Sequence, residues 1–172
     1  SIKHFPGHGD TDVDSHKELP IVNNTLTHIE AVDFYPFRAG INAGASSVMI
    51  GHLNIPALDP SGTPSSLSKK TIHEYLKGEL GFQGLVVSDA LGMKAVADRY
   101  GKTEVVVKAF EAGCDILLFP KSVVDAIDAI EKKVLDGEIS EEDINLRCKR
   151  VLLAKYKSII KPGKLKSYTK GE

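Results

Sequence analysis

The chain has 172 residues, of which 42% are hydrophobic and 26% are charged, and its formal net charge is -1. This length suits one domain and is short for two. The near-neutral balance argues against a nucleic-acid-binding protein, and no apolar run approaches the roughly 20 residues that span a bilayer.

Four short apolar segments predict β-strands, at residues 2–5, 45–51, 84–89 and 115–120. Each segment is bounded by glycine, proline or polar residues, and none shows a clean alternation of apolar and polar side chains. This pattern is typical of strands that are buried on both faces of a parallel sheet.

Helical patterns separate the strands. The first covers residues 27–44, with Thr27 as N-cap and a break or bend at Pro36, where a backbone N–H is missing. The second lies within residues 66–82, with Ser68 as N-cap and apolar side chains on one face.

Three further helices are predicted, each starting at a serine or threonine N-cap, at residues 103–113, 122–137 and 140–157. The first two end at a glycine, and the last opens with SEED, which is close to a capping box. We interpret residues 1–158 as one domain and residues 159–172 as a basic, solvated C-terminal tail.

The two cysteines, Cys114 and Cys148, form no disulfide framework, and both lie in segments that predict burial as inert core thiols. The chain begins with Ser1 and not with methionine, so we expect it to be the middle of a longer gene product. No signal peptide is visible, and the sequence leaves the compartment, cytoplasmic or exported, undetermined.

The order of elements is a strand, a loop and a helix, repeated four times, with one extra helix. Such alternation predicts an α/β fold with parallel strands and right-handed crossovers. Four βα units fit either half of an eight-stranded (β/α)₈ barrel or a small open sheet. Polar residues follow the predicted strands, with His52 after the second and Asp89 after the third, as at the active sites of such folds.

The first strand leads into an unusually titratable stretch, KHFPGHGDTDVDSH, at residues 3–16. Its possible metal ligands are His4, His8, His16, Asp10, Asp12 and Asp14. The stretch lacks the HExxH and paired-cysteine patterns of zinc sites, and Ile21 stands where a calcium loop requires glutamate. A metal site is therefore one interpretation, and the weaker one.

The second interpretation is acid/base chemistry. Asp14 and His16 are two residues apart, so on an extended loop their side chains point the same way. A carboxylate beside an imidazole orients the ring and raises its pKa, which suits proton donation near neutral pH. Asp89, at the end of an otherwise apolar strand, could be a nucleophile or the N-cap of a following helix. We predict structural roles for Gly7 and Gly9, as turn residues with positive φ, and for His8.

The stretch KHFPGHGDTDVDSH, followed by ELPIV, and the later GFQGLVVSDALGMKAV closely resemble glycoside hydrolase family 3, in its β-N-acetylglucosaminidase (β-hexosaminidase) branch. GHLNIPALDPSGTPSSLS and EAGCDILLFP extend the resemblance over nearly the whole chain. The family fold is a (β/α)₈ TIM barrel, so the resemblance implies that these four βα units are its C-terminal half.

The resemblance also implies a retaining mechanism that needs neither a cofactor nor a metal. It assigns Asp89 as the nucleophile and His16, paired with Asp14, as the acid/base. The residues that it places near the sugar are Lys3, His4, His52 and Met93. The expected substrate is a terminal β-linked N-acetylglucosamine in muropeptides or related oligosaccharides, as in the peptidoglycan recycling of bacteria.

Two other functions stay open. The chain could be a catalytically silent half-barrel that needs a missing N-terminal half or pairs with itself, because half a barrel exposes two sheet edges. It could also be a β-glucosidase-type member, although the intact DSH of the loop points away from those members.

Overall fold

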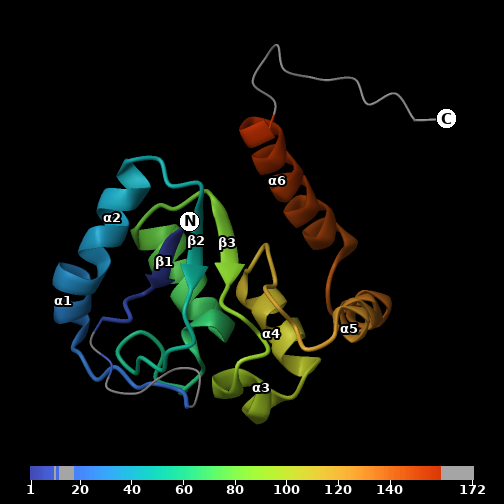
Figure 1. Ribbon diagram of the computed structural model, residues 1–172, viewed down its shortest axis with the longest axis horizontal. Helices are drawn as coiled ribbons and strands as arrows, with labels where there is room; N and C mark the ends of the chain where they lie inside the picture. The colour runs from blue at the N-terminus through green and yellow to red at the C-terminus, as the bar shows by residue number, and fades with distance from the viewer. Residues whose placement is uncertain (10, 12–17, 160–172) are drawn as a thin grey trace.

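The computed structural model describes residues 1–9, 11 and 18–159. Its sheet has three parallel strands in the order of the chain: β1 (Ile2–Phe5), β2 (Ser47–Ile50) and β3 (Leu85–Ser88) (Figure 1). The first three predicted strands are therefore confirmed. Because the strands are parallel, their carboxyl ends lie at one edge of the sheet, which is the lower edge in Figure 1.

The prediction of a fourth regular strand at residues 115–120 is wrong. An isolated bridge at Ile116 attaches the segment to β3. Among the described residues, main-chain hydrogen bonds between the segment and β3 are confined to Asp115 and Ile116. Two side chains make further bonds: Asp115 Oδ2 accepts a main-chain N–H of β3 at 2.8 Å, and Ser88 Oγ accepts one from the segment at 3.0 Å. Phe119 then adopts a φ of 42°, which ends the extended conformation.

The first predicted helix is one continuous helical region of three parts: α1 (Leu26–His28), η1 (Ile29–Asp33) and α2 (Phe34–Asn42). Its N-cap is Thr25 and not Thr27, since Thr25 Oγ1 accepts the main-chain N–H of His28 at 3.2 Å. Pro36 does not break the helix. The wider π-helical turn of η1 places Pro36 in the first turn of α2, where its missing N–H is tolerated.

The remaining helices lie against the sheet or to its right in Figure 1. They are η2 (Ser65–Leu67), η3 (Thr71–Glu79), α3 (Lys94–Tyr100), α4 (Glu104–Ala112), α5 (Val123–Leu135) and α6 (Glu141–Ile159). Three predicted serine caps are confirmed, because the side chains of Ser68, Ser122 and Ser140 each accept a main-chain N–H three residues later. Thr103 occupies the N-cap position of α4 without a side-chain cap bond. The helix considered after Asp89 is present as the short α3, although no bounds were predicted for it.

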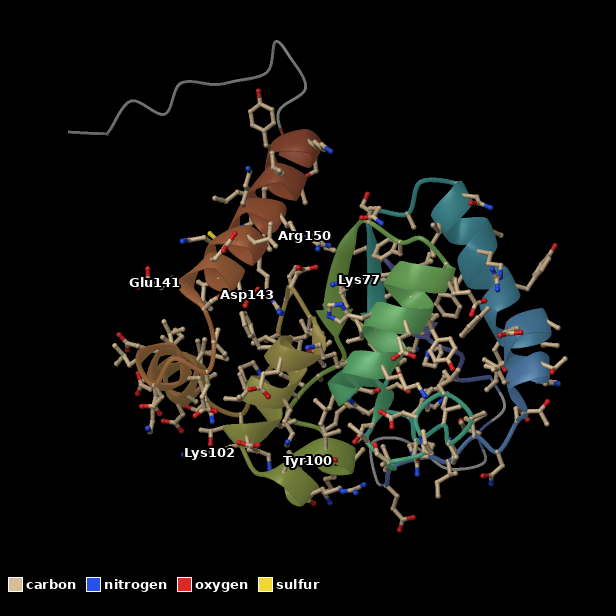
Figure 2. All side chains as sticks on the ribbon, turned by 180° about the vertical axis from the view of Figure 1, so that it is seen from behind. Lys77, Tyr100, Lys102, Glu141, Asp143 and Arg150 are labelled. Carbon is tan, nitrogen blue, oxygen red and sulfur yellow. The ribbon has the colours of Figure 1, made fainter. Side chains whose placement is uncertain are left out.

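Two arginines of α6 attach this helix to the rest of the domain. Arg147 donates to the carbonyl oxygens of Phe110 and Cys114 at 2.6 and 2.7 Å, and it lies 3.8 Å from the centre of the Phe110 ring. Arg150 reaches from α6 towards the sheet, where it pairs with Asp115 at 3.2 Å (Figure 2). Arg147 therefore binds carbonyl groups at and just after the end of α4, and Arg150 joins α6 to the segment beside β3.

The two cysteines differ in burial, so the prediction of a buried thiol is confirmed for Cys114 and wrong for Cys148. Cys114 is fully buried, and burial raises the pKa of its thiol to about 12. Cys148 is exposed, because it lies on a face of α6 that the described part of the chain leaves uncovered. The apolar pattern around Cys148 predicted a buried helix face and could not show how little of α6 packs on the domain.

We therefore expect a thiol-specific disulfide reagent at pH 8 to modify one cysteine of the native chain rapidly, and to modify both in denaturant. The thiolate is the reactive form, and Cys114 is kept protonated and inaccessible. Absorbance of the released thiol measures the stoichiometry, with Cys148→Ser as the control. Rapid reaction of two thiols in the folded chain would contradict the burial of Cys114.

Candidate active site

The loops that follow β1, β2 and β3 meet at the carboxyl edge of the sheet (Figure 1). Of the predicted site residues, Lys3 and His4 lie on β1, His52 follows β2, and Asp89 and Met93 follow β3. The structure therefore brings His4, His52 and Asp89 together at this edge, because the Asp89 carboxylate acts on both imidazoles. Lys3 lies within β1, and Met93 lies at the start of α3. Asp14 and His16 lie outside the described residues, so their role stays a prediction.

Asp89 is half-buried directly after β3. Its main-chain N–H donates to the carbonyl of Ile50 at 3.0 Å, which continues the ladder from β2. Its carboxylate Oδ1 accepts the main-chain N–H of Ala90 at 2.8 Å. The next helix, α3, has Met93 at its N-cap position, so Asp89 does not cap it. Asp89 presents a carboxylate at the sheet edge from a backbone that is hydrogen-bonded to β2.

His4 lies near Asp89 on the β1 side of the edge, and His8 packs beside His4. Their ring centres are 5.8 Å apart in an edge-on arrangement. Burial lowers the pKa of His4, and the nearby Asp89 carboxylate opposes this effect without reversing it. His4 is therefore a mainly neutral imidazole near pH 7, able to donate one hydrogen bond and accept another.

His8 is held by its own loop. The hydroxyl of Thr11 donates to the main-chain carbonyl of His8 at 3.2 Å, and its oxygen lies 2.9 Å from His8 Nδ1. Since that hydroxyl hydrogen is used by the carbonyl, Nδ1–H is the donor to Thr11. These contacts support the predicted structural role of His8.

Two glycines allow β1 and the loop after it to pack closely against neighbouring elements. Gly7 has a φ of 145°, as predicted, and an added Cβ would lie 2.8 Å from Asp33 Oδ1. Gly51 lets β1 approach β2, since a Cβ there would lie 3.2 Å from Cβ of His4. Gly9 does not have the predicted positive φ.

His52 is fully buried, and both of its ring nitrogens have internal partners. Nε2–H donates to the main-chain carbonyl of Ala90 at 3.0 Å, because a carbonyl can only accept. The hydroxyl of Ser66 then donates to Nδ1 across 2.6 Å. His52 thus joins the loop after β2 to the loop that carries Asp89.

The remaining two residues differ in exposure. Lys3 is exposed on β1, and Met93 is half-buried with its N–H donating to the carbonyl of Ala90 at 3.0 Å. Ser66 and Thr11, which fix the two histidines, were not identified from sequence. Ser66 is 14 residues from His52, which is too far to be found from local spacing. Thr11 is 3 residues from His8, so local spacing could have indicated that pair.

The buried His52 also predicts a pH dependence of stability. Burial lowers its pKa below the ordinary value of 6.5, although the Ala90 hydrogen bond and Asp89 oppose this, and the unfolded state does not share the shift. As pH falls below 6.5, the unfolded state therefore binds the proton first, and the free energy of unfolding decreases.

We expect the free energy of unfolding to fall more between pH 7 and pH 5 in the wild-type chain than in His52→Gln. Urea unfolding at several pH values measures the two slopes, and His28→Gln, on the exposed α1, serves as the control. Equal slopes in wild type and His52→Gln would contradict a buried neutral His52.

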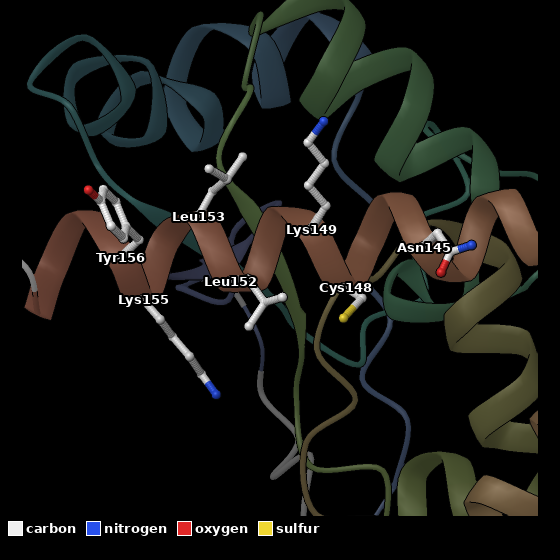
Figure 3. Close-up of a pocket in the computed structure, with 7 residues that line it drawn as sticks. All are labelled: Asn145, Cys148, Lys149, Leu152, Leu153, Lys155 and Tyr156. Carbon is white, nitrogen blue, oxygen red and sulfur yellow. The ribbon is translucent and has the colours of Figure 1, made fainter. Parts of the chain in front are cut away.

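Other features of the described residues lie away from this edge. None of their histidines, cysteines, aspartates and glutamates form a group of three that could hold a metal ion, and none of their helices is long and apolar enough to cross a membrane. A hollow of about 680 Å³ follows the outer face of α6 (Figure 3), lined by Asn145, Cys148, Lys149, Leu152, Leu153, Lys155 and Tyr156. Its lining carries no carboxylate or imidazole.

The family profile described as "Glycosyl hydrolase family 3 N terminal domain" matches residues 1–154. A β-hexosaminidase of Stenotrophomonas maltophilia K279a is 39% identical over 138 residues, which cover 79% of this chain and 41% of that protein. A β-hexosaminidase of Xylella fastidiosa M23 is 40% identical over 132 residues, covering 76% and 39%. The chain thus spans about two fifths of these relatives.

The chain is also similar to a solved structure. The glycoside hydrolase family 3 β-N-acetylglucosaminidase from Paenibacillus sp. FPU-7 superposes with a TM-score of 0.89 at 39% identity. The superposition covers 99% of this chain and 33% of that protein.

Proposed function

Because the chain belongs to glycosyl hydrolase family 3, we propose that it carries the nucleophile side of a retaining β-N-acetylglucosaminidase site. The observation that carries the proposal is Asp89, a half-buried carboxylate at the carboxyl end of β3 on a backbone fixed from β2. The names of the relatives, β-hexosaminidase and β-N-acetylglucosaminidase, support the choice of sugar.

The proposed reaction has two displacements. In the first, an Asp89 carboxylate oxygen forms a bond to the anomeric carbon while the bond to the leaving oxygen breaks, and His16 gives that oxygen a proton. In the second, water attacks the same carbon, His16 takes the proton of the water, and Asp89 is released. Asp14 orients His16, and Lys3 and His4 bind sugar hydroxyls. The electron pairs and protons balance without a metal or cofactor.

We propose further that the parallel strands and the Ile116 segment form the C-terminal half of an eight-stranded barrel. Parallel order, consecutive pairing and polar carboxyl ends support this arrangement. The substrate would then be a terminal β-linked N-acetylglucosamine of a muropeptide or a related oligosaccharide. A silent half-barrel remains the second candidate, because the chain spans only about two fifths of its relatives.

The test uses nitrophenyl glycosides. The 172-residue chain is assayed together with a chimera in which residues 1–154 replace the matching segment of the S. maltophilia enzyme. We expect the chimera to release nitrophenol from the β-N-acetylglucosaminide, with a preference over the β-glucoside on the order of 10²-fold or more.

Release by the chain alone would show that it assembles a working site without the remaining strands. Release by the chimera only would show a half-barrel that depends on them. A folded but inactive chimera beside an active parent enzyme would contradict the proposal, and a preference for the β-glucoside would favour the β-glucosidase alternative.

A further inference from the structure

We propose that His52 is a positioning residue for the loop that carries Asp89 and not a ligand of the sugar. The inference rests on the proposed function of Asp89. It follows from one geometric fact: the buried imidazole uses both nitrogens inside the protein, on Ala90 and Ser66.

The loop after β3 contains a tight turn from Ala90 to Met93, and Ala90 is its first residue. The N–H of Ala90 donates to Asp89 Oδ1, and its carbonyl accepts from both Met93 N–H and His52 Nε2–H. The carboxylate and the imidazole therefore bind the same residue, one at its N–H and the other at its carbonyl. A shift of Ala90 would move the Asp89 carboxylate with it.

The other supports of this turn are main-chain bonds. Asp89 N–H binds the carbonyl of Ile50, and the N–H groups of Leu91 and Gly92 bind carbonyls of the segment at residues 115–120. His52 is the side chain that joins the turn to β2. It supplies a link that a single substitution can remove while the main-chain supports remain.

Ser66 completes the hydrogen bonding of His52. The carbonyl of Ala90 can only accept, so Nε2 is the protonated nitrogen. The hydroxyl of Ser66, which lies in η2 and is fully buried, then donates to Nδ1. A sugar hydroxyl would have to displace either the fully buried Ser66 or the carbonyl of Ala90. This geometry fits an orienting group behind the nucleophile, of the kind that holds catalytic groups in place.

The experiment compares His52→Leu, which keeps much of the volume and removes the donor, with His52→Gln, which keeps an N–H donor. Amide exchange of the 172-residue chain is followed by NMR. We expect exchange at Met93 to become about tenfold faster in His52→Leu and to return to within about threefold of wild type in His52→Gln. His28→Gln is the matched control. Unchanged exchange in a folded His52→Leu chain would overturn the proposal.

Steady-state kinetics then separate a positioning role from sugar binding. They are measured on the chain if it is active alone, and otherwise on the chimera. We expect His52→Leu to lower kcat about 100-fold with little change in KM, and His52→Gln to recover most of that loss. A raised KM with unchanged kcat would overturn the proposal in favour of a sugar contact. Activity that survives Asp89→Asn would instead disprove the nucleophile, while the exchange measurement, which needs no turnover, would still decide the role of His52.

Discussion

Replacing Asp89 with asparagine is expected to lower kcat for the aryl β-N-acetylglucosaminide on the order of 10⁴-fold or more. The amide cannot form the covalent glycosyl intermediate, whereas its oxygen can still accept the N–H of Ala90, so the turn is retained. The measurement is nitrophenol release by the active form of the chain. Asp98→Asn, at an exposed aspartate of α3, is the matched control and should leave kcat unchanged.

A second substitution tests the role of Asp89 as nucleophile and not as a general charge. In Asp89→Ala, azide can enter the vacated space and attack the anomeric carbon from the face opposite the leaving group. The expected product is the α-glycosyl azide, with nitrophenolate released, whereas wild type gives the β-configured sugar. NMR of the product distinguishes the two configurations. Absence of rescue together with substantial activity of Asp89→Asn would contradict the assignment.

The helix caps and the ends of the strands were predictable, because they depend on residues that are close together in the sequence. Ser122 and Ser140 form caps with N–H groups three residues away, and Asp89 follows a short apolar strand directly. The family motif assigned the candidate site at the same edge that the parallel strands define. In each case the partners are close in sequence or set by the strand direction.

Features that depend on distant partners could not be predicted. The segment at residues 115–120 has the composition of a buried strand, but its main-chain hydrogen bonds to β3 end at Ile116. The buried contact of His52 with Ala90 spans 38 residues, and no periodicity indicates it. Cys148 was misassigned for the same reason, since its exposure depends on how α6 leaves the domain.

An aromatic cluster packs against β1, the strand that carries Lys3 and His4. Phe5, the last residue of β1, stacks on Phe34 with ring centres 5.3 Å apart and meets Phe37 edge-on at 5.1 Å. Phe34 also contacts Tyr75 of η3, with ring centres 6.1 Å apart. Phe34 thus links the first strand, which leads into the loop of His8, to helices on two sides.

We expect Phe34→Ala to lower the free energy of unfolding by about 4 kcal/mol, because it leaves a cavity and removes the contact with Phe5. Its neighbour Tyr35 is 70% exposed on the same helix, whereas Phe34 is 0% exposed, so Tyr35→Ala should cost below about 0.5 kcal/mol. Urea unfolding measures both. Similar losses for the two variants would mean that the cluster does not hold β1 in place, and the site loop would then need another support.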